Sequence, residues 1–131
     1  MHLTDALVAP LVRVAERHPE IQAVYLFGSQ ATGTATPDSD VDVGVLYASP
    51  QPLARTLELE DAVAQVLGRR VDVVDVATSG AFLALEIVRG ARVFCRDSTA
   101  ADLFELYVLG RAGDLLPYER ERQALLGLST S

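Results

Sequence analysis

The sequence predicts an α/β fold: one small domain in which helices flank a mixed β-sheet of about four strands, followed by a helical tail. Short segments rich in β-branched and aromatic residues alternate with longer segments whose apolar residues recur at helical spacing. The 131 residues, half of them hydrophobic, suffice to build one core. We therefore expect a single domain over residues 1–131, with its core at about 20–96 and its tail at 98–128.

The first half of the chain is expected to form two helices and two strands. His18 ends the first helix because Pro19 disfavours helical geometry in the residue before it. Gly68 is the expected stop of the second helix. The predicted elements are a helix over 3–17, strands over 21–27 and 40–47, and a helix over 53–67.

The second half is expected to add two strands and three helices. Ser98 is the expected N-terminal cap of the helix that it begins, because a serine oxygen accepts hydrogen bonds from the free N–H groups of the first turn. The predicted elements are a strand over 70–76, a helix from 79 or 80 to about 89, a short strand over 92–95, and helices over 98–109 and 117–126.

Acidic and apolar residues alternate along the second predicted strand. Its core-facing side chains are three valines: Val41, Val43 and Val45. Asp40 and Asp42 face the other side, where Gly44 leaves space beside them. Two carboxylates on one face of a strand can hold a divalent cation together, and a cation offsets the energetic cost of burying them. The alternation therefore predicts a cation site on a rigid element.

The turn before this strand has the composition of a phosphate-binding loop. Gly28 and Ser29 close the first predicted strand, and Gly33 follows in the same loop. Glycine lets the backbone approach a ligand closely, and successive backbone N–H groups in a turn bind phosphate oxygens. A phosphate-binding turn beside a pair of metal-binding carboxylates is what metal-dependent chemistry on a nucleoside triphosphate requires.

Other interpretations of the acidic residues fit less well. Asp38, Asp40 and Asp42 begin like an EF-hand calcium loop, but the glycine falls at 44 rather than 43, and Ser49 stands where the bidentate glutamate belongs. A P-loop is excluded because the chain has no lysine. Solvated surface carboxylates remain the simplest alternative for an isolated D-x-D pair.

The composition excludes several classes of function. A net charge of −7 argues against direct nucleic-acid binding, which normally needs a basic surface. The single cysteine, Cys95, excludes an internal disulfide and a cysteine-based zinc site. No apolar run approaches the roughly 20 residues needed to cross a bilayer, and no secretory signal is visible. We therefore expect a cytoplasmic protein without a membrane partner.

The combined motif resembles a known family. Gly28-Ser29, the glycine five residues on at Gly33, and Ser39-Asp40-x-Asp42 are similar to the nucleotidyltransferase signature of the DNA polymerase β superfamily. The short chain and the strand predicted over 70–76 look like the minimal nucleotidyltransferases, the antitoxin partners of HEPN-domain toxins. This resemblance covers about residues 20–96 well and the helical tail more loosely.

The resemblance implies a role for each residue of the motif. Asp40 and Asp42 would hold one or two Mg²⁺ ions, and a third carboxylate from a later strand would complete the catalytic and metal-binding set. Asp72 and Asp75 are the candidates, and Asp72 is favoured, with Asp75 capping the turn that follows its strand. The implied nucleotide-binding residues are Gly28, Ser29, Gly33 and Ser39.

One position departs from the resemblance. Many relatives carry an arginine where this chain has Thr32, so one positive charge near the phosphates is missing. Arg55, Arg69 or Arg70 could replace it, although each is expected to be a solvated surface charge.

The resemblance predicts an Mg²⁺-dependent adenylyltransferase that transfers AMP from ATP to a tyrosine hydroxyl of a cognate HEPN ribonuclease toxin and thereby neutralises it. An antitoxin that acts by binding alone is one alternative, and a nucleotidyltransferase for small molecules is another. A binding antitoxin needs an apolar contact surface, but we expect the apolar tail residues to close the core instead. These residues are Leu103, Leu106, Tyr107, Leu115 and Leu116.

Overall fold

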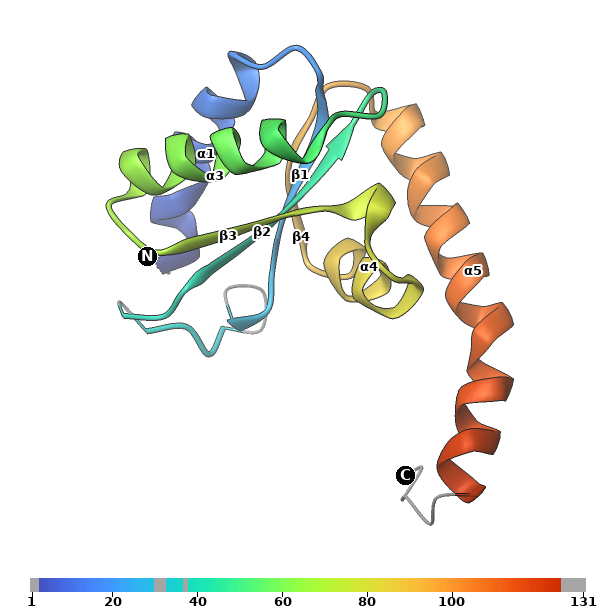
Figure 1. Ribbon diagram of the computed structural model, residues 1–131. Coiled ribbons are helices and arrows are strands. Elements are labelled where there is room, and N and C mark those ends of the chain that lie inside the picture. The colour runs from blue at the N-terminus through green and yellow to red at the C-terminus, as the bar shows by residue number, and fades with distance from the viewer. Residues whose placement is uncertain (1–2, 30–32, 37, 126–131) are drawn as a thin grey trace.

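The computed structural model describes the backbone of residues 3–29, 33–36 and 38–125, and the side chains of residues 6–29, 33–36 and 38–113 (Figure 1). Its elements are α1 (Leu3–Glu16), β1 (Ile21–Phe27), β2 (Val41–Tyr47), α3 (Leu53–Leu67), β3 (Val71–Asp75), a 3-10 turn η1 (Val76–Thr78), α4 (Ala81–Val88), β4 (Ala91–Cys95) and α5 (Ser98–Leu125). The α/β prediction is confirmed, and the predicted elements as far as β4 agree with these bounds to within two residues. Among the described residues, no helix combines the length and apolar composition that crossing a bilayer requires.

The sheet is mixed, with the strand order β3-β2-β1-β4. β1 is antiparallel to both of its neighbours, β2 and β4, whereas β2 and β3 are parallel. The C-terminal end of β1 therefore lies beside the N-terminal ends of the other three strands. We call this the acidic end of the sheet, because Phe27, Asp42 and Asp72 are in register there.

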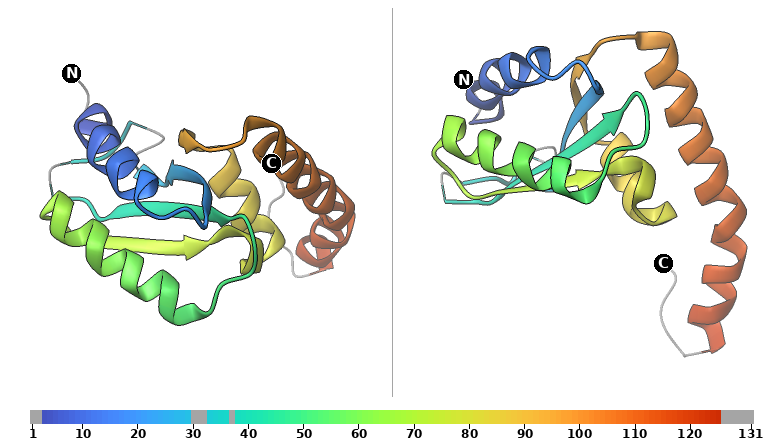
Figure 2. Two further views of the ribbon diagram at one scale, coloured as in Figure 1. Left: turned by 90° about the horizontal axis from the view of Figure 1, so that it is seen from above. Right: turned by 45° about the horizontal axis from the view of Figure 1, so that its top comes forward.

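Two helices cover each face of the sheet (Figure 2). α1 and α3 pack on the face that carries the valines of β2, and Leu11, Val43 and Leu59 are buried there together. α4 and α5 pack on the other face, where Tyr25 and Ile87 are completely buried. The face of β2 that carries its acidic residues is therefore the face beneath α4.

The outer strand β3 is closed on its free side by α3. The Val73 N–H donates to Glu60 Oε2 at 2.9 Å. Glu60 thus satisfies a backbone donor that the outermost strand of a sheet would otherwise leave without a strand partner.

The sequence-based expectation for Gly44 is wrong. Instead of leaving space beside the acidic residues, this position is filled by α4: a Cβ at Gly44 would collide with Ile87 Cγ2 and lie 3.2 Å from Val76 Cγ2. The glycine was correctly placed on the acidic face, but a helix from a later part of the chain occupies the space. Gly44 therefore fixes how closely α4 approaches β2.

Gly44→Ala is expected to lower the free energy of unfolding by about 1–3 kcal/mol, because the added methyl group overpacks this contact. Ile87→Ala removes the opposing methyl group and is expected to destabilise the protein on its own. The double variant should lose less stability than the sum of the two single losses, since the new methyl group at position 44 fills part of the space that Ile87→Ala leaves. Urea denaturation of the four proteins measures this, and strictly additive losses would contradict the contact.

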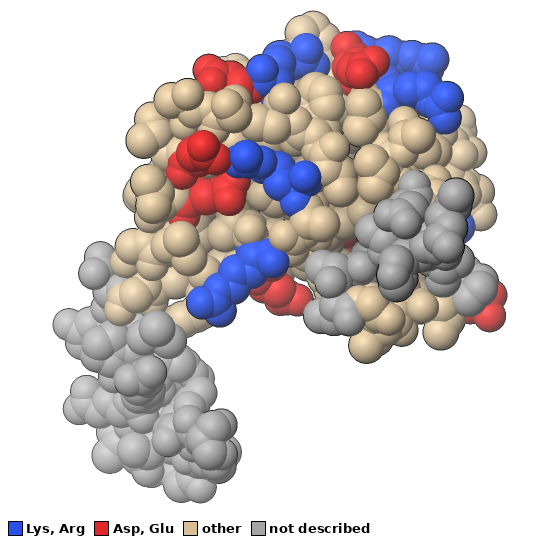
Figure 3. All heavy atoms as spheres, turned by 180° about the vertical axis from the view of Figure 1, so that it is seen from behind, with Lys and Arg blue, Asp and Glu red and all other residues tan. Residues whose placement is uncertain are grey.

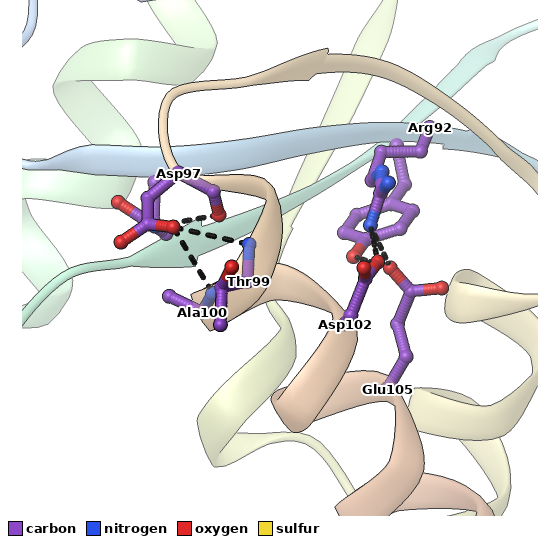
Figure 4. A network of polar contacts seen from close by, with 8 residues as sticks. Arg92, Asp97, Thr99, Ala100, Asp102 and Glu105 are labelled. Atoms are coloured by element: carbon purple, nitrogen blue, oxygen red, sulfur yellow. Dashed lines mark hydrogen bonds and ion pairs between the residues drawn. The ribbon is translucent and has the colours of Figure 1, made fainter.

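The C-terminal part corrects two predictions. Residues 98–125 form one helix, α5, instead of two, because Gly110 and Gly113 weaken a helix by only about 1 kcal/mol each without ending it. Asp97, not Ser98, caps it: Asp97 Oδ1 accepts hydrogen bonds from the N–H groups of Thr99 at 3.0 Å and Ala100 at 3.3 Å (Figure 4). A carboxylate at this position also interacts favourably with the helix dipole.

A polar network fastens α5 to the sheet (Figure 4). The buried Tyr25 hydroxyl donates to Glu105 Oε2 at 2.8 Å, and burial raises the pKa of Tyr25 well above its usual value. Arg92 of β4 contacts the same Glu105 oxygen at 2.6 Å and Asp102 at 2.7 Å. The first turns of α5 are thus held to β1 and β4 by a tyrosine and an arginine.

The outward face of α5 is apolar. Leu103, Leu106 and Tyr107 are each at least 60% exposed, so the expectation that they close the core is wrong. The side chains of Leu115 and Leu116 lie outside the described part of the chain. Buried small and branched residues make the inward contacts instead, namely Ala101, Val108 and Ala112.

Candidate active site

The parallel pairing of β2 and β3 brings two of the predicted acidic residues together. Asp42 is in register with Asp72, and neighbouring strands lie about 4.8 Å apart. The adjacent pair, Val43 and Val73, is buried on the face beneath α1 and α3, so alternation places both aspartates on the opposite face. Asp40 directly precedes β2 and is close enough for its charge to act on Asp42.

Asp42 carries an unfavourable negative charge. Its pKa is raised, first by burial and then by the negative charges of Asp72, Asp40 and Glu86. Glu86 lies on α4 and was not predicted as part of the site, because its closeness to Asp42 depends on how α4 packs against β2. Four carboxylates therefore gather at the acidic end of the sheet, with Asp42 the most buried of the aspartates.

The turn after β1 packs directly against Asp42. Gly28 has a φ of +68°, and a Cβ at this position would lie 2.5 Å from Asp42 Oδ2. Both features require glycine: L-residues rarely adopt this backbone conformation, and a side chain would collide with the carboxylate. Ser29 follows in this turn, where its carbonyl accepts a hydrogen bond from the Thr34 N–H at 3.1 Å. The predicted phosphate-binding turn and the predicted metal-binding residue are thus in contact.

The rest of the loop contains two further residues of the predicted nucleotide-binding set. Gly33 also has a positive φ, +76°, and is exposed. Ser39 makes a local contact, because its Oγ accepts a hydrogen bond from the Thr36 N–H at 2.9 Å. Ser39 therefore shapes the loop just before β2. Thr32, the position that lacks the common arginine, lies outside the described residues.

Arg69 holds this loop in place, which the sequence did not predict. Its guanidinium donates to the backbone carbonyl of Thr36 at 3.1 Å and to the carbonyl of Ser39. The expectation of a purely solvated charge is therefore wrong for Arg69. Arg55 differs in position, because it pairs with Glu20, just before β1, at 3.9 Å and is thus remote from the acidic end.

Asp75 is separated from the site along β3. It is in register with Val45, and its Oδ1 accepts a hydrogen bond from the Ala77 N–H at 3.1 Å. The predicted capping role is confirmed. Of the two candidates for the third carboxylate, the structure places only Asp72 beside Asp42.

The chemistry of the acidic residues fits a hard divalent cation. Asp40, Asp42 and Asp72 offer only carboxylate oxygens, which Mg²⁺ prefers, and no ion pair is recorded for them in the described part of the chain. In the same part, no three acidic, histidine or cysteine side chains are close enough to form a ready-made metal cluster. A cation held here would therefore have to draw the carboxylates of β2 and β3 closer together.

The arginines on one face of the molecule are not contiguous. On the face seen in Figure 3, they lie in several separate groups and do not form one continuous basic groove.

Three comparisons place this geometry among known proteins. Residues 10–99 match the family described as Polymerase beta, Nucleotidyltransferase. The chain is 30% identical over 108 residues to the protein adenylyltransferase MntA of Shewanella oneidensis, covering 82% of this chain and 76% of that protein. In a crystal structure of a toxin–antitoxin complex with AMP-PNP, one chain is similar with a TM-score of 0.77 and 26% identity, covering 92% of this chain and 95% of that one.

A third relative shares the fold. A chain from the complex of tri-AMPylated Shewanella oneidensis HEPN toxin with its MNT antitoxin has a TM-score of 0.73 and 23% identity, covering 95% of this chain and 97% of that one. The family match spans every described residue of the turn and the three aspartates. The resemblance inferred from the sequence is thereby confirmed: the chain belongs to the polymerase β nucleotidyltransferase family.

Proposed function

We propose that this chain is an Mg²⁺-dependent protein adenylyltransferase that transfers AMP from ATP to a hydroxyl group, a tyrosine of a cognate HEPN toxin, and so neutralises the toxin. The observation that carries the proposal is the contact of Gly28 with Asp42, which itself lies in register with Asp72. A phosphate-binding turn thus adjoins a pair of carboxylates in a member of the nucleotidyltransferase family. The curated relative that covers most of this chain is a protein adenylyltransferase.

Each group has a distinct task in this proposal. The backbone N–H groups of the turn at Gly28 and Ser29 bind the β- and γ-phosphates. Asp40, Asp42 and Asp72 hold the metal, which when bound supplies positive charge to the phosphates and the departing pyrophosphate. The acceptor oxygen attacks the α-phosphorus, the bond from this phosphorus to the bridging oxygen breaks, and pyrophosphate leaves.

Asp72 is the residue best placed to meet the acceptor. It lies on the outer strand β3 and is exposed, whereas Asp42 is partly buried between the turn and β3. A hydroxyl group on another protein can reach an exposed carboxylate at the border of the sheet. We propose that Asp72 accepts the proton of that hydroxyl as the new bond to phosphorus forms.

The test is label transfer from ATP to the cognate HEPN toxin in the presence of Mg²⁺. ATP labelled at the α-phosphate should label the partner, whereas ATP labelled at the γ-phosphate should not, because AMP and not phosphate is transferred. The Asp72→Asn variant should transfer little label and the Asp75→Asn variant should transfer as much as wild type. Label from the γ-phosphate, or none from either position, would contradict the proposal.

Neutralisation by binding alone is a second candidate, and the exposed apolar face of α5 favours it. The exposed side chains of Leu103, Leu106 and Tyr107 offer an apolar contact surface. Under this alternative, the double variant Asp40→Asn/Asp42→Asn would still protect cells from the toxin. Under the enzymatic proposal, the double variant binds the toxin but no longer protects. We place either activity in the cytoplasm, where ATP is available.

A further inference from the structure

We propose that Arg89, the residue that follows α4, binds the β- and γ-phosphates of the nucleotide. This inference rests on the proposed function and adds to it the residue that supplies fixed positive charge. A nucleoside triphosphate is strongly anionic, and at the acidic end it would lie beside Asp40, Asp42, Asp72 and Glu86. The chain has no lysine, so arginine is its only permanently charged cation.

Three arginines directly precede strands at the acidic end, namely Arg69 and Arg70 before β3 and Arg89 before the Gly90–β4 segment. Most other described arginines either bind other protein groups or lie far from the acidic end. Arg92 pairs with Asp102 and Glu105, and Arg96 donates to backbone carbonyls near the start of β1.

Among the three at the acidic end, Arg69 is already engaged with the carbonyls of the loop before β2. Arg70 precedes β3, which is two strands away from β1, or about 10 Å at the usual strand spacing. Arg89 precedes β4, the direct neighbour of β1. Of the two arginines that are not bound to this loop, Arg89 is thus the one that precedes a strand adjacent to β1.

Close backbone packing fixes the position of Arg89. A Cβ at Gly90 would collide with the carbonyl oxygen of Leu26, and Leu26 is in register with Ala91. The end of α4 is thus pressed against β1 two residues before Gly28. The side chain of Arg89 is exposed, and no ion pair is recorded for it with any described residue.

The neighbouring turn of α4 supports this placement. Glu86 lies three residues before Arg89, and residues at this spacing share one side of a helix. The negative charge of Glu86 contributes to the raised pKa of Asp42, so this side of α4 faces the acidic end. Arg89 thus borders the acidic end on its β4 side, next to the turn at Gly28. A guanidinium there can bind two phosphate oxygens at once.

This role predicts a selective effect on nucleotide binding. Because AMP lacks the β- and γ-phosphates, loss of Arg89 should weaken the binding of ATP analogues and leave AMP binding nearly unchanged. A purely structural role of Arg89 would weaken both alike.

The test is calorimetric titration of the full chain with AMP-PNP and with AMP in the presence of Mg²⁺. Arg89→Ala is expected to raise the Kd for AMP-PNP about tenfold and the Kd for AMP less than about twofold. Arg89→Gln is a second neutral variant in case the alanine variant folds poorly. Arg70→Ala and Arg13→Ala are the controls. Arg13 is exposed in the last turn of α1, remote from the acidic end. Each control variant should change the Kd for AMP-PNP and the Kd for AMP less than about threefold.

The outcomes separate this inference from the proposed function. Wild-type binding of AMP-PNP with no loss in either Arg89 variant would overturn the role of Arg89 and leave the adenylyltransferase proposal intact. A larger loss in Arg70→Ala, or equal losses for AMP-PNP and AMP in Arg89→Ala, would also overturn it. Failure of the wild-type protein to bind AMP-PNP would contradict both proposals.

Discussion

Asp42→Asn is expected to abolish AMP transfer and at the same time to stabilise the protein in metal-free buffer. Asp42 lies between Gly28 and Asp72, so its loss removes the central carboxylate of the proposed metal site. We expect a loss of at least about 10³-fold in transfer rate, equivalent to about 4 kcal/mol in the activation barrier. Label transfer from ATP to the partner protein measures it.

The gain in stability follows from the raised pKa of Asp42. A carboxyl group whose pKa is higher in the folded state binds its proton more tightly there, so stability falls as pH rises from the unfolded pKa through the folded one. Asparagine has no charge and removes this fall. Melting temperatures in EDTA should therefore diverge above the carboxyl pKa range, with Asp42→Asn the more stable protein. Equal melting temperatures at neutral pH would show that burial and neighbouring charges do not destabilise the ionised Asp42.

Gly28→Ala is expected to reduce AMP transfer by at least about 10²-fold. The added Cβ would lie 2.5 Å from Asp42 Oδ2, so either the turn or the carboxylate must move, and both belong to the proposed site. The positive φ of Gly28 adds a conformational penalty of about 1 kcal/mol to the free energy of folding. Transfer rates and urea denaturation measure the two effects separately.

Gly68→Ala is the matched control. Gly68 ends α3 with a φ of +64°, close to that of Gly28, but a Cβ there would have no atom within 4 Å. Its substitution should cost a similar conformational penalty and leave AMP transfer unchanged. If both variants lost activity to the same degree, backbone strain and not the contact with Asp42 would explain the effect of Gly28→Ala.

Much of the fold was predictable because its signals are local. The β-branched and aromatic residues of β1 and the helical spacing of α3, which ends at Gly68, gave both sets of bounds correctly. The errors arose where contacts with distant parts of the chain determine the structure. Ile87 fills the space beside Gly44, and α5 continues through Gly110 and Gly113, where Val108 and Ala112 are buried against the rest of the domain.

In the candidate site, too, local sequence patterns were predictable and contacts between distant segments were not. The alternation of acidic and apolar residues predicted Asp40 and Asp42 on one face, and the family resemblance favoured Asp72 over Asp75. The position of Asp72 directly beside Asp42 follows from the register of β2 with the parallel strand β3. Glu86 could not be found from its neighbours in the sequence, because only the packing of α4 brings it near Asp42. Arg69 was named as a possible replacement for the missing arginine, but its hydrogen bonds to the loop before β2 could not be predicted.

The hydrogen bond from Val73 to Glu60 limits how an acceptor protein can approach Asp72. Because Glu60 of α3 already binds the outward N–H of Val73, an incoming chain could not pair with β3 at this residue by strand addition. A substrate protein would then present its hydroxyl on a projecting loop or tail that points into the acidic end of the sheet. In this geometry the site would recognise only the side chain that carries the hydroxyl. Most of the binding energy between the two proteins would then have to come from other surfaces of this chain.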